Sequence, residues 1–368
     1  MISKRLLVVL AMAAALAFGI AACGDANSGS DSSNAAGSDS GGSVSGNIAG
    51  AGSSAQDAAM QAWIAGLQSS SPDATVSYDP VGSGGGREQF VAGGVDFAGS
   101  DSALADDELS GAQKRCGGTD NLIEIPVYVS PIAVVYNVPG VDSLQLSPET
   151  TAKIFKQEIN NWNDPAIAAE NPGAKLPDLR ISPVNRSDES GTTANFTDWM
   201  SQAAPKVWTY EPDSNWPVKG GEAAEGTSGV IDAVKNGKGT IGYADESQAG
   251  ELGVAKIKVG NEYVAPSAEA AAAVLDKSKE STDAGKYVFT FKLDRTVTGT
   301  YPVTLVSYQI ACTKYDSADK GKLVQALYKY IVSPEGQDAA AKNAGSAPIS
   351  DKLRQQIQPA VDAIGSGS

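Results

Sequence analysis

One short segment gathers the residue types that bind a small anion. Arg186 stands four residues before Ser190, Gly191 and Thr192, which open a predicted helix. A guanidinium group offers a fork of N–H donors, and the hydroxyls and backbone N–H groups at a helix start offer further donors to the same tetrahedral group. Asp188 stands where it could orient the arginine. The segment therefore offers the donors for oxyanion binding, although on composition alone a surface loop with an exposed ion pair would be favoured.

Two earlier turns share this design. Residues 50–54 read Gly-Ala-Gly-Ser-Ser and residues 82–86 read Gly-Ser-Gly-Gly-Gly, and each turn precedes a predicted helix. Unpaired N–H groups and the helix dipole favour an anion at such a position. A single turn of this kind is usually a plain helix cap or turn. Three of them in one chain, together with Arg186, point to one shared anion site.

These turns must be positioned by strands that alternate with helices. Strand-like and helical runs follow one another along the first part of the body, which predicts an α/β fold with mainly parallel pairing. The expected strands are 47–50, 74–78 and 95–99, and the expected helices are 54–67 and one that begins at 87.

Two long apolar runs divide the folded body. Residues 123–137 and 301–310 are extended enough to cross from one lobe to another and back. A body of more than three hundred residues also exceeds the size at which a single core usually stops growing. We therefore expect two lobes, the first formed by 46–128 and 306–368 and the second by 129–305.

The beginning of the chain is typical of an export signal. Positive charges precede an apolar run at 6–20 that is too short for a stable membrane span, and Cys23 follows shortly after it. This end resembles a bacterial lipobox, which implies a lipoprotein signal peptide at 1–22 and lipid on Cys23. The alternative is an ordinary signal peptide with an incidental cysteine. The Gly- and Ser-rich stretch 23–45 is expected to be a flexible tether.

Composition excludes several classes of function. The formal net charge of −15 makes nucleic acid and anionic membrane surfaces poor partners. The sequence contains no histidine, which excludes Ser-His-Asp and Cys-His catalysis and removes the commonest zinc ligand. We expect neither a metal nor a cofactor. Besides Cys23 the chain has Cys116 and Cys312, and the sequence leaves open whether these two are bridged or free.

The motifs resemble, in order and spacing, those of the phosphate-binding proteins of the PstS type. The matching segments are 50–54, 82–85, 95–101 and 186–192, with 159–165 and 239–243 as further matches. The resemblance implies a two-lobed periplasmic-binding-protein fold of type II, with two mixed, mainly parallel sheets joined by a two-strand hinge. It also implies an extracytoplasmic monomer that is not an enzyme, binds inorganic phosphate and delivers it to the membrane permease of a phosphate ABC transporter.

Carried over residue by residue, the resemblance assigns a phosphate site. It consists of Ser54, Ala55, Ser83, Asp101, Arg186, Ser190, Gly191 and Thr192, with Asp188 as the support of the arginine. Asp101 matches an acceptor carboxylate, which can pair with a phosphate proton but would face only repulsion from fully ionised sulfate. The chain departs from the family at Ala55, where phenylalanine is common, and at Glu189, where glycine is common. Glu189 is expected to bring negative charge close to the bound dianion.

Two other functions are weighed against phosphate delivery. One is a receptor or sensor for another tetrahedral oxyanion, which competition by arsenate, sulfate and molybdate would reveal. The other is a phosphate-ester hydrolase with Ser83 or Ser190 as nucleophile, against which stand the missing histidine and the missing dense Asp/Glu cluster. The pattern G-x-G-x-x-G at 237–242 leads from a helical run into a strand, so we interpret it as a turn and not as a dinucleotide site.

Overall fold

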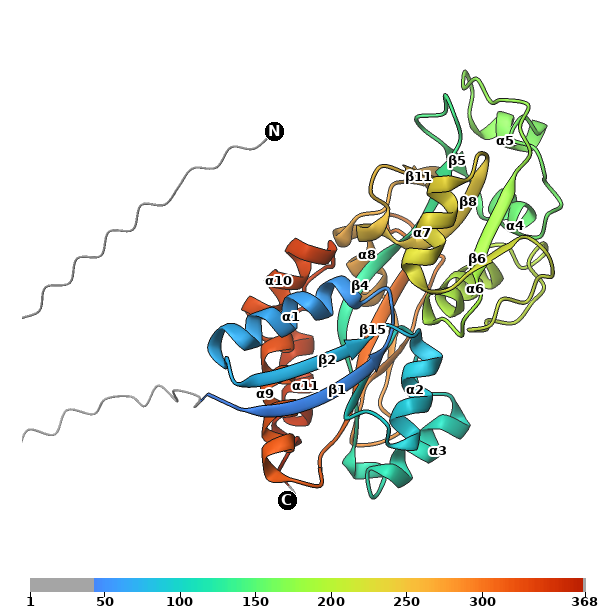
Figure 1. Cartoon of the computed structure of the whole chain (residues 1–368). Coiled ribbons are helices and arrows are strands. Elements are labelled where there is room, and N and C mark those ends of the chain that lie inside the picture. Colours follow the sequence, from blue (N-terminus) through green and yellow to red (C-terminus); the bar gives the residue numbers. More distant parts are fainter. Residues whose placement is uncertain (1–42, 367–368) are drawn as a thin grey trace, which may run out of the picture. The chain divides into compact units, whose positions relative to one another are not determined.

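The computed structural model describes residues 43–366 (Figure 1). The predicted signal peptide, the predicted lipid-bearing Cys23 and most of the predicted tether lie outside these residues. The helices are α1 (Asp57–Ser70), α2 (Ser83–Ala92), α3 (Asp106–Arg115), α4 (Pro148–Phe155), α5 (Pro165–Glu170), α6 (Gly191–Ala203), α7 (Gly226–Asn236), α8 (Ala268–Asp276), α9 (Ala318–Val332), α10 (Pro334–Ala344) and α11 (Asp351–Ala363), with short 3-10 turns η1 (Thr119–Asn121) and η2 (Glu246–Gln248).

The strands form one large mixed sheet and two small ones. They are β1 (Gly46–Gly52), β2 (Ala74–Asp79), β3 (Phe97–Ser100), β4 (Leu122–Asn137), β5 (Gln145–Leu146), β6 (Ser182–Arg186), β7 (Glu222–Ala224), β8 (Thr240–Asp245), β9 (Gly253–Val254), β10 (Lys256–Val259), β11 (Glu262–Val264), β12 (Lys279–Ser281), β13 (Tyr287–Val288), β14 (Thr290–Lys292) and β15 (Thr304–Cys312). The large sheet has the order β2-β1-β3-β15-β4-β8-β6-β7, and β9 and β13 also pair with β4. Pairing is parallel around β1 and β6 and antiparallel between β15 and its two neighbours and between β4 and β8.

Strand β4 is shared by both parts of the large sheet. Nine of its first ten residues pair with β15, from Leu122 opposite Cys312 to Pro131 opposite Thr304, with a bulge at Val127, and the rest pair with β8. Nearly all of its 16 residues are buried, which explains why its sequence is a continuous apolar run and not an alternating one. The predicted mixed α/β fold is confirmed, whereas the division into two lobes at 128 and 305 stays a prediction.

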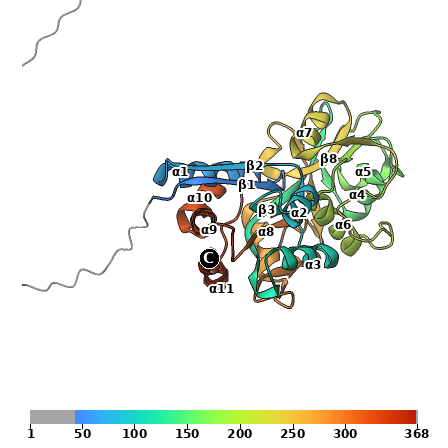
Figure 2. The same ribbon diagram turned by 60° about the horizontal axis from the view of Figure 1, so that its bottom comes forward.

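Helices cover both faces of the part formed by β1, β2, β3 and β15 (Figures 1 and 2). Ile48 and Phe97 point into a core built with α1, α9, α10 and α11. Ala51 and Ala98, each on the opposite face of the same strands, point into a second core built with α2 and α3. Burial on both faces fixes these short strands, and with them the turns that follow their ends.

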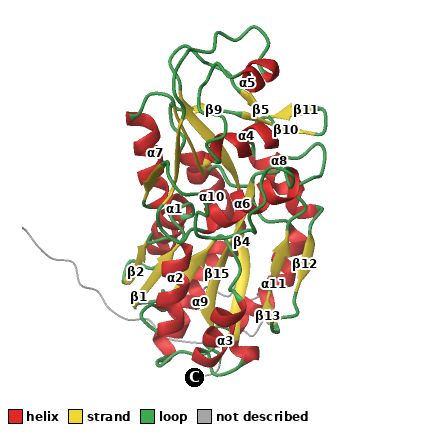
Figure 3. Cartoon of the chain, turned by 90° about the vertical axis from the view of Figure 1, so that its right-hand side faces the viewer, coloured by secondary structure: helices red, strands yellow, loops and turns green. Residues whose placement is uncertain are grey.

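The part formed by β4, β6 and β8 is covered in the same way, by α7 on one face and α6 on the other (Figures 1 and 3). Val184 packs with Val230 and Val234 of α7 on one face. On the other face Phe196 of α6 stacks on Tyr243 of β8 with ring centroids 4.3 Å apart. Aromatic stacking of this kind adds to the stability supplied by burial. It anchors α6, whose first residues belong to the predicted site.

A disulfide joins the end of α3 to the end of β15. Cys116 and Cys312 are separated by 196 residues in the sequence, and their Cα atoms lie 5.2 Å apart. Persistent disulfides are typical of oxidising compartments outside the cytoplasm. Among the residues from 43 to 366, no helix combines the length and apolar character needed to cross a bilayer.

Candidate anion-binding site

The predicted site residues lie where strands end and helices begin. Six described helices start with a serine side chain that caps the first turn, and α6 is one of them, capped by Ser190. Helices α2 and α7 differ, because their N-cap residues Gly82 and Glu225 make no side-chain cap bond. Their first N–H groups are therefore left to partners from elsewhere in the chain. All eight predicted ligands are buried.

Asp101 connects the turn after β3 to the starts of α2 and α6. One carboxylate oxygen accepts a hydrogen bond from Ser307 Oγ at 2.7 Å, and the other accepts one from Thr192 Oγ1 at 3.2 Å. The backbone N–H of Asp101 donates to Ser83 Oγ at 3.1 Å. A Cβ on Gly191 would lie 2.7 Å from Ser83 Oγ and 2.8 Å from Asp101 Cβ, so only glycine permits this approach. Four of the predicted ligands thus meet at one point.

The buried position of Asp101 changes its acidity. Burial raises the pKa of the Asp101 carboxyl, while hydrogen bonds from Ser53, Ser307 and Thr192 and the charge of Arg186 offset only part of the rise. A carboxylate with a raised pKa is a stronger acceptor for a proton. Asp101 is therefore suited to pair with a ligand that carries a hydroxyl group.

Arg186 is held by two hydrogen bonds to one carboxylate. Its Nε donates to Asp188 Oδ1 at 2.7 Å, and its Nη2 donates to Asp188 Oδ2. Asp188 Oδ1 also accepts the N–H of Gly226, and the backbone N–H of Arg186 donates to the hydroxyl of Tyr243. The other terminal nitrogen, Nη1, makes no hydrogen bond with any residue that the structure describes. The guanidinium is thus oriented with one donor group left for a ligand.

Asp188 shows the opposite pKa shift to Asp101. Burial alone would raise the pKa of Asp188, but the hydrogen bonds and charge of Arg186, together with the N–H of Gly226, outweigh it and lower the pKa. Asp188 is therefore the ionised partner that keeps the arginine in place. Its role in supporting a phosphate-binding arginine stays a prediction.

Ser54 contacts a helix that the sequence had not suggested. Its Oγ lies 3.0 Å from Thr227 Oγ1 and accepts the N–H of Thr227 at 3.0 Å. Its backbone carbonyl accepts a hydrogen bond from Gln248 Nε2. Ala55 follows it and is fully buried. Within the described part of the chain, these two residues make no hydrogen bond to the other predicted ligands, so the structure groups them with the start of α7.

Ser190 contributes mainly to the helix. Its Oγ accepts the N–H of Thr193 at 3.2 Å, and its own N–H donates to the carbonyl of Ser214 at 3.0 Å. An accepting hydroxyl oxygen still carries a proton that it can donate. Ser190 can therefore cap α6 and remain a hydroxyl donor to a ligand beside Thr192 and Gly191.

Sequence reasoning missed three contributors to this arrangement. Thr227 follows Gly226 in a Gly-Thr-Ser-Gly segment that forms the first turn of α7, and this pattern resembles the one that pointed to the other turns, so this residue could have been found. Ser307 lies inside a buried strand, where nothing in the sequence distinguishes it. Arg87 donates from Nη2 to Glu189 Oε1 at 2.7 Å, so the charge of Glu189 has a partner that the sequence did not reveal.

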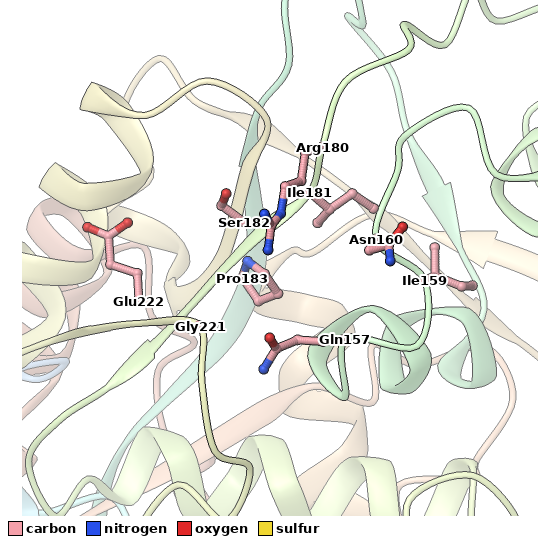
Figure 4. Close-up of a pocket in the computed structure, with 9 residues that line it drawn as sticks. All are labelled: Gln157, Ile159, Asn160, Arg180, Ile181, Ser182, Pro183, Gly221 and Glu222. Carbon is pink, nitrogen blue, oxygen red and sulfur yellow. The ribbon is translucent and has the colours of Figure 1, made fainter.

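Two pockets lie near these elements. One of about 280 Å³ reaches Asp101 from the side of Asn195 and Tyr308. Another of about 340 Å³ lies at the beginning of β6, the end opposite Arg186, and Figure 4 shows that its lining includes none of the predicted ligands. No group of three or more acidic or cysteine side chains in residues 43–366 is arranged to hold a metal ion.

Comparison with known proteins identifies relatives of the chain. Residues 37–335 match a family described as the PBP superfamily domain. The chain is 36% identical over 320 residues to phosphate-binding protein PstS 3 of Mycobacterium leprae, covering 85% of each chain. It is 33% identical over 304 residues to phosphate-binding protein PstS of Haemophilus influenzae, covering 80% of this chain and 87% of the relative.

Solved structures share the fold. A high affinity periplasmic phosphate-binding protein bound with phosphate superposes with a TM-score of 0.71 at 23% identity, covering 85% of this chain and 93% of that one. A phosphate binding protein from Stenotrophomonas maltophilia gives a TM-score of 0.68 at 19% identity, covering 86% and 94%. At these identities the likeness establishes the architecture.

Proposed function

Because the chain belongs to the PBP superfamily, and within it to the phosphate-binding proteins of the PstS type, we propose that it binds inorganic phosphate for an ABC transporter. It is a binding protein and not an enzyme. The observation that carries the proposal is the arrangement of Arg186 and Asp101. A guanidinium oriented by Asp188 keeps one donor group for an anion, and a buried carboxylate provides an acceptor for a proton on that anion.

The ligand set of the proposal is the one named from the sequence. Arg186, Ser83, Ser54 and the start of α6 at Ser190, Gly191 and Thr192 supply donors, and the N–H of Ala55 supplies another. Asp101 supplies the acceptor that selects phosphate over sulfate, since sulfate has no proton to donate near neutral pH. Two hydrogen bonds support this arrangement, because they bring donors close to the acceptor. Thr192 Oγ1 donates to the Asp101 carboxylate, and the N–H of Asp101 donates to Ser83 Oγ, whose own proton stays available.

The cellular setting is part of the same proposal. A lipid on Cys23 and a tether over 23–45 would hold a monomeric body at the outer side of the cell membrane, where the permease can receive phosphate. The disulfide between Cys116 and Cys312 supports an oxidising location. Closure of two lobes, 46–128 with 306–368 against 129–305, would enclose the ligand and present the loaded form to the permease.

The hydrolase alternative is disfavoured by the contacts of its two candidate nucleophiles. Ser83 Oγ accepts the backbone N–H of Asp101, and Ser190 Oγ accepts that of Thr193. A serine nucleophile needs an adjacent base, and the sequence contains no histidine. Neither serine is therefore set up to attack a phosphate ester.

Isothermal titration tests the proposal. The chain without its predicted signal peptide, stripped of ligand, is titrated near neutral pH with phosphate and then with sulfate, arsenate and molybdate. Tight one-to-one phosphate binding with no response to sulfate supports the proposal. Preference for molybdate or sulfate would establish a receptor for another oxyanion, and folded protein that binds none of these ions would refute oxyanion binding.

A further inference from the structure

Arg87 is a buried arginine that is not one of the proposed phosphate ligands. Its Nε donates to both carboxylate oxygens of Glu108 at 2.9 Å, and its Nη1 donates to the hydroxyls of Ser100 at 3.0 Å and Ser102 at 2.8 Å. A buried charge must be paired and hydrogen-bonded, and these partners meet that need. Ser100 and Ser102 flank Asp101 in the sequence. Arg87 therefore holds the turn that carries the proposed acceptor carboxylate.

A further bond of Arg87 reaches the segment before α6. Its Nη2 donates to Glu189 Oε1 at 2.7 Å, across 102 positions of sequence. The N–H of Gly84 also donates to the carbonyl of Glu189 at 3.0 Å. Glu189 immediately precedes Ser190, the cap of α6. Two bonds thus tie the start of α2 to the start of α6, the two helices whose first residues supply proposed phosphate donors.

The local backbone is adapted to this contact. A Cβ on Gly84 would lie 2.3 Å from Glu189 Cδ, so a side chain at position 84 would displace the glutamate. The Arg87 side chain is 3% exposed and that of Glu189 is 43% exposed. The pair therefore has one partner fixed in the interior and one at the surface. A contact of this kind can form and break while Arg87 keeps its hydrogen bonds to Glu108, Ser100 and Ser102.

We propose that the Arg87–Glu189 ion pair is a clasp that holds the phosphate-binding segments together and slows phosphate release. Both residues are positioning residues and neither is a ligand. This inference rests on the proposed function and deepens it. Charge alone predicts the opposite effect, because a carboxylate close to a bound dianion should weaken binding through repulsion. Removing the charge of Glu189 therefore distinguishes the two effects. Phosphate release should become faster if the ion pair acts as a clasp and slower if repulsion dominates.

The test measures release of radiolabelled phosphate from the full chain after addition of excess unlabelled phosphate. Glu189→Gln keeps the size of the side chain and removes its charge, so release should accelerate about two- to fivefold, within the range of partly exposed ion pairs. The association rate should change less than about twofold, since the clasp acts after binding. The difference from wild type should shrink in about 1 M salt, where screening weakens exposed charges.

The matched control is Glu158→Gln. Glu158 pairs with Lys156 at 2.7 Å, and the Glu158 side chain is 48% exposed. The variant therefore loses a comparable ion pair outside the site. Its release rate should equal that of wild type. Glu189→Gly, which removes the side chain altogether, should accelerate release at least as much as Glu189→Gln.

The outcomes separate the clasp from the function on which it rests. Slower or unchanged release in both Glu189 variants, with normal phosphate binding by wild type, overturns the clasp alone, and slower release identifies repulsion as the dominant effect. Faster release that does not depend on salt also overturns the clasp. Salt screens interactions between charges but not side-chain packing, so such a result would point to lost packing. Wild-type protein that binds no phosphate overturns the proposed function and the clasp together.

Discussion

Arg186 acts on two carboxylates, on Asp188 through hydrogen bonds and on Asp101 through its charge, and the environments of the two carboxylates give them different roles. Burial raises the pKa of Asp101, whereas the hydrogen bonds and charge of Arg186 overcome burial and lower the pKa of Asp188. One carboxylate is thus prepared to share a proton, and the other is prepared to stay ionised. Pairs of groups shifted in opposite directions commonly mark a division of roles in a site.

The first prediction at this scale concerns Asp101→Asn. The amide cannot accept a ligand proton as a carboxylate does, so selectivity for phosphate over sulfate, expected at about 10⁴-fold, should largely disappear. Because the folded-state pKa of Asp101 is raised, its charge costs stability at neutral pH, and the substitution should increase the free energy of unfolding there.

Titration calorimetry with both anions and urea unfolding at neutral pH check these two effects. Ser307→Ala, which removes one donor to Asp101 and keeps the carboxylate, serves as the comparison and should retain most of the selectivity. Unchanged selectivity in Asp101→Asn would refute the proton-pairing role.

The second prediction concerns Asp188→Asn and pH. A lowered folded-state pKa means that Asp188 contributes stability above its unfolded pKa of about 3.9 and loses that contribution as the pH falls through the folded pKa. The variant should therefore be less stable than wild type at neutral pH, and the gap should close in acid. Phosphate affinity should fall as well, because Arg186 loses its support.

Urea unfolding between neutral pH and about pH 3 measures this gap. Asp294→Asn is the control, because Asp294 also has a lowered pKa, caused by local hydrogen bonds from Thr296, but lies almost fully exposed. A gap that is constant with pH would show that Asp188 acts through shape and not through charge.

At the scale of elements, the site depends on how closely helix starts approach strand ends. Gly86 in α2 faces the end of β1, where a Cβ would lie 2.3 Å from the Cα of Gly52. Such a distance cannot be relieved by a side-chain rotation, since the opposing atom is backbone. The first turn of α2, which carries Ser83, can lie at the end of β1 only because position 86 has no side chain.

Gly86→Ala should therefore move α2 away from the strand ends. We expect a loss of about 1–3 kcal/mol in the free energy of unfolding, as for other overpacked positions, together with weaker phosphate binding. Gly85→Ala is the control one residue away, where a Cβ would meet only a Val81 methyl group at 3.1 Å. Urea unfolding and calorimetry of both variants check this prediction. If the two variants had the same free energy of unfolding and the same phosphate affinity, the importance of the close approach at Gly86 would be refuted.

Part of this arrangement could be predicted from the sequence and part could not. Local patterns, namely Gly/Ser turns before helical runs, pointed to residues 82–86, to the start of α6 and to the segment around Arg186. The helix expected from position 87 begins at Ser83, so the predicted glycine-rich turn is the first turn of α2. The same pattern at Thr227 was available but unused. Contacts such as Ser307 with Asp101, 206 positions apart, depend on how β15 enters the sheet, and no local pattern encodes that. The pairing of Glu189 with Arg87 was hidden for the same reason.

At the scale of the whole molecule, the disulfide connects segments that are distant in sequence. The bond between Cys116 and Cys312 is part of the core that α2 and α3 form with the sheet. Closing a loop of this length restricts the unfolded chain strongly in the entropy model of disulfide stabilisation. We therefore expect it to contribute to stability more than to ligand affinity.

The double variant Cys116→Ala/Cys312→Ala should lose about 2–4 kcal/mol in the free energy of unfolding. Phosphate affinity should be unchanged at temperatures where the protein stays folded, because neither cysteine contacts a proposed ligand. Wild-type protein treated with a reductant should shift to the same unfolding midpoint. Equal stability of oxidised and reduced protein would contradict a stabilising role for the bond.

The position of β15 in the sheet leads to an expectation about when the protein folds during its synthesis. This strand, made near the end of the chain, lies between β3 and β4, which the ribosome produces far earlier. Until residues beyond Thr304 have emerged, β3 and β4 each present an unpaired edge, and α9 is absent from the face of β1. We therefore expect early collapse of the N-terminal segment to be disfavoured, so that the nascent chain stays open until translation is almost complete. Such a delay would suit the export that the proposed signal peptide implies.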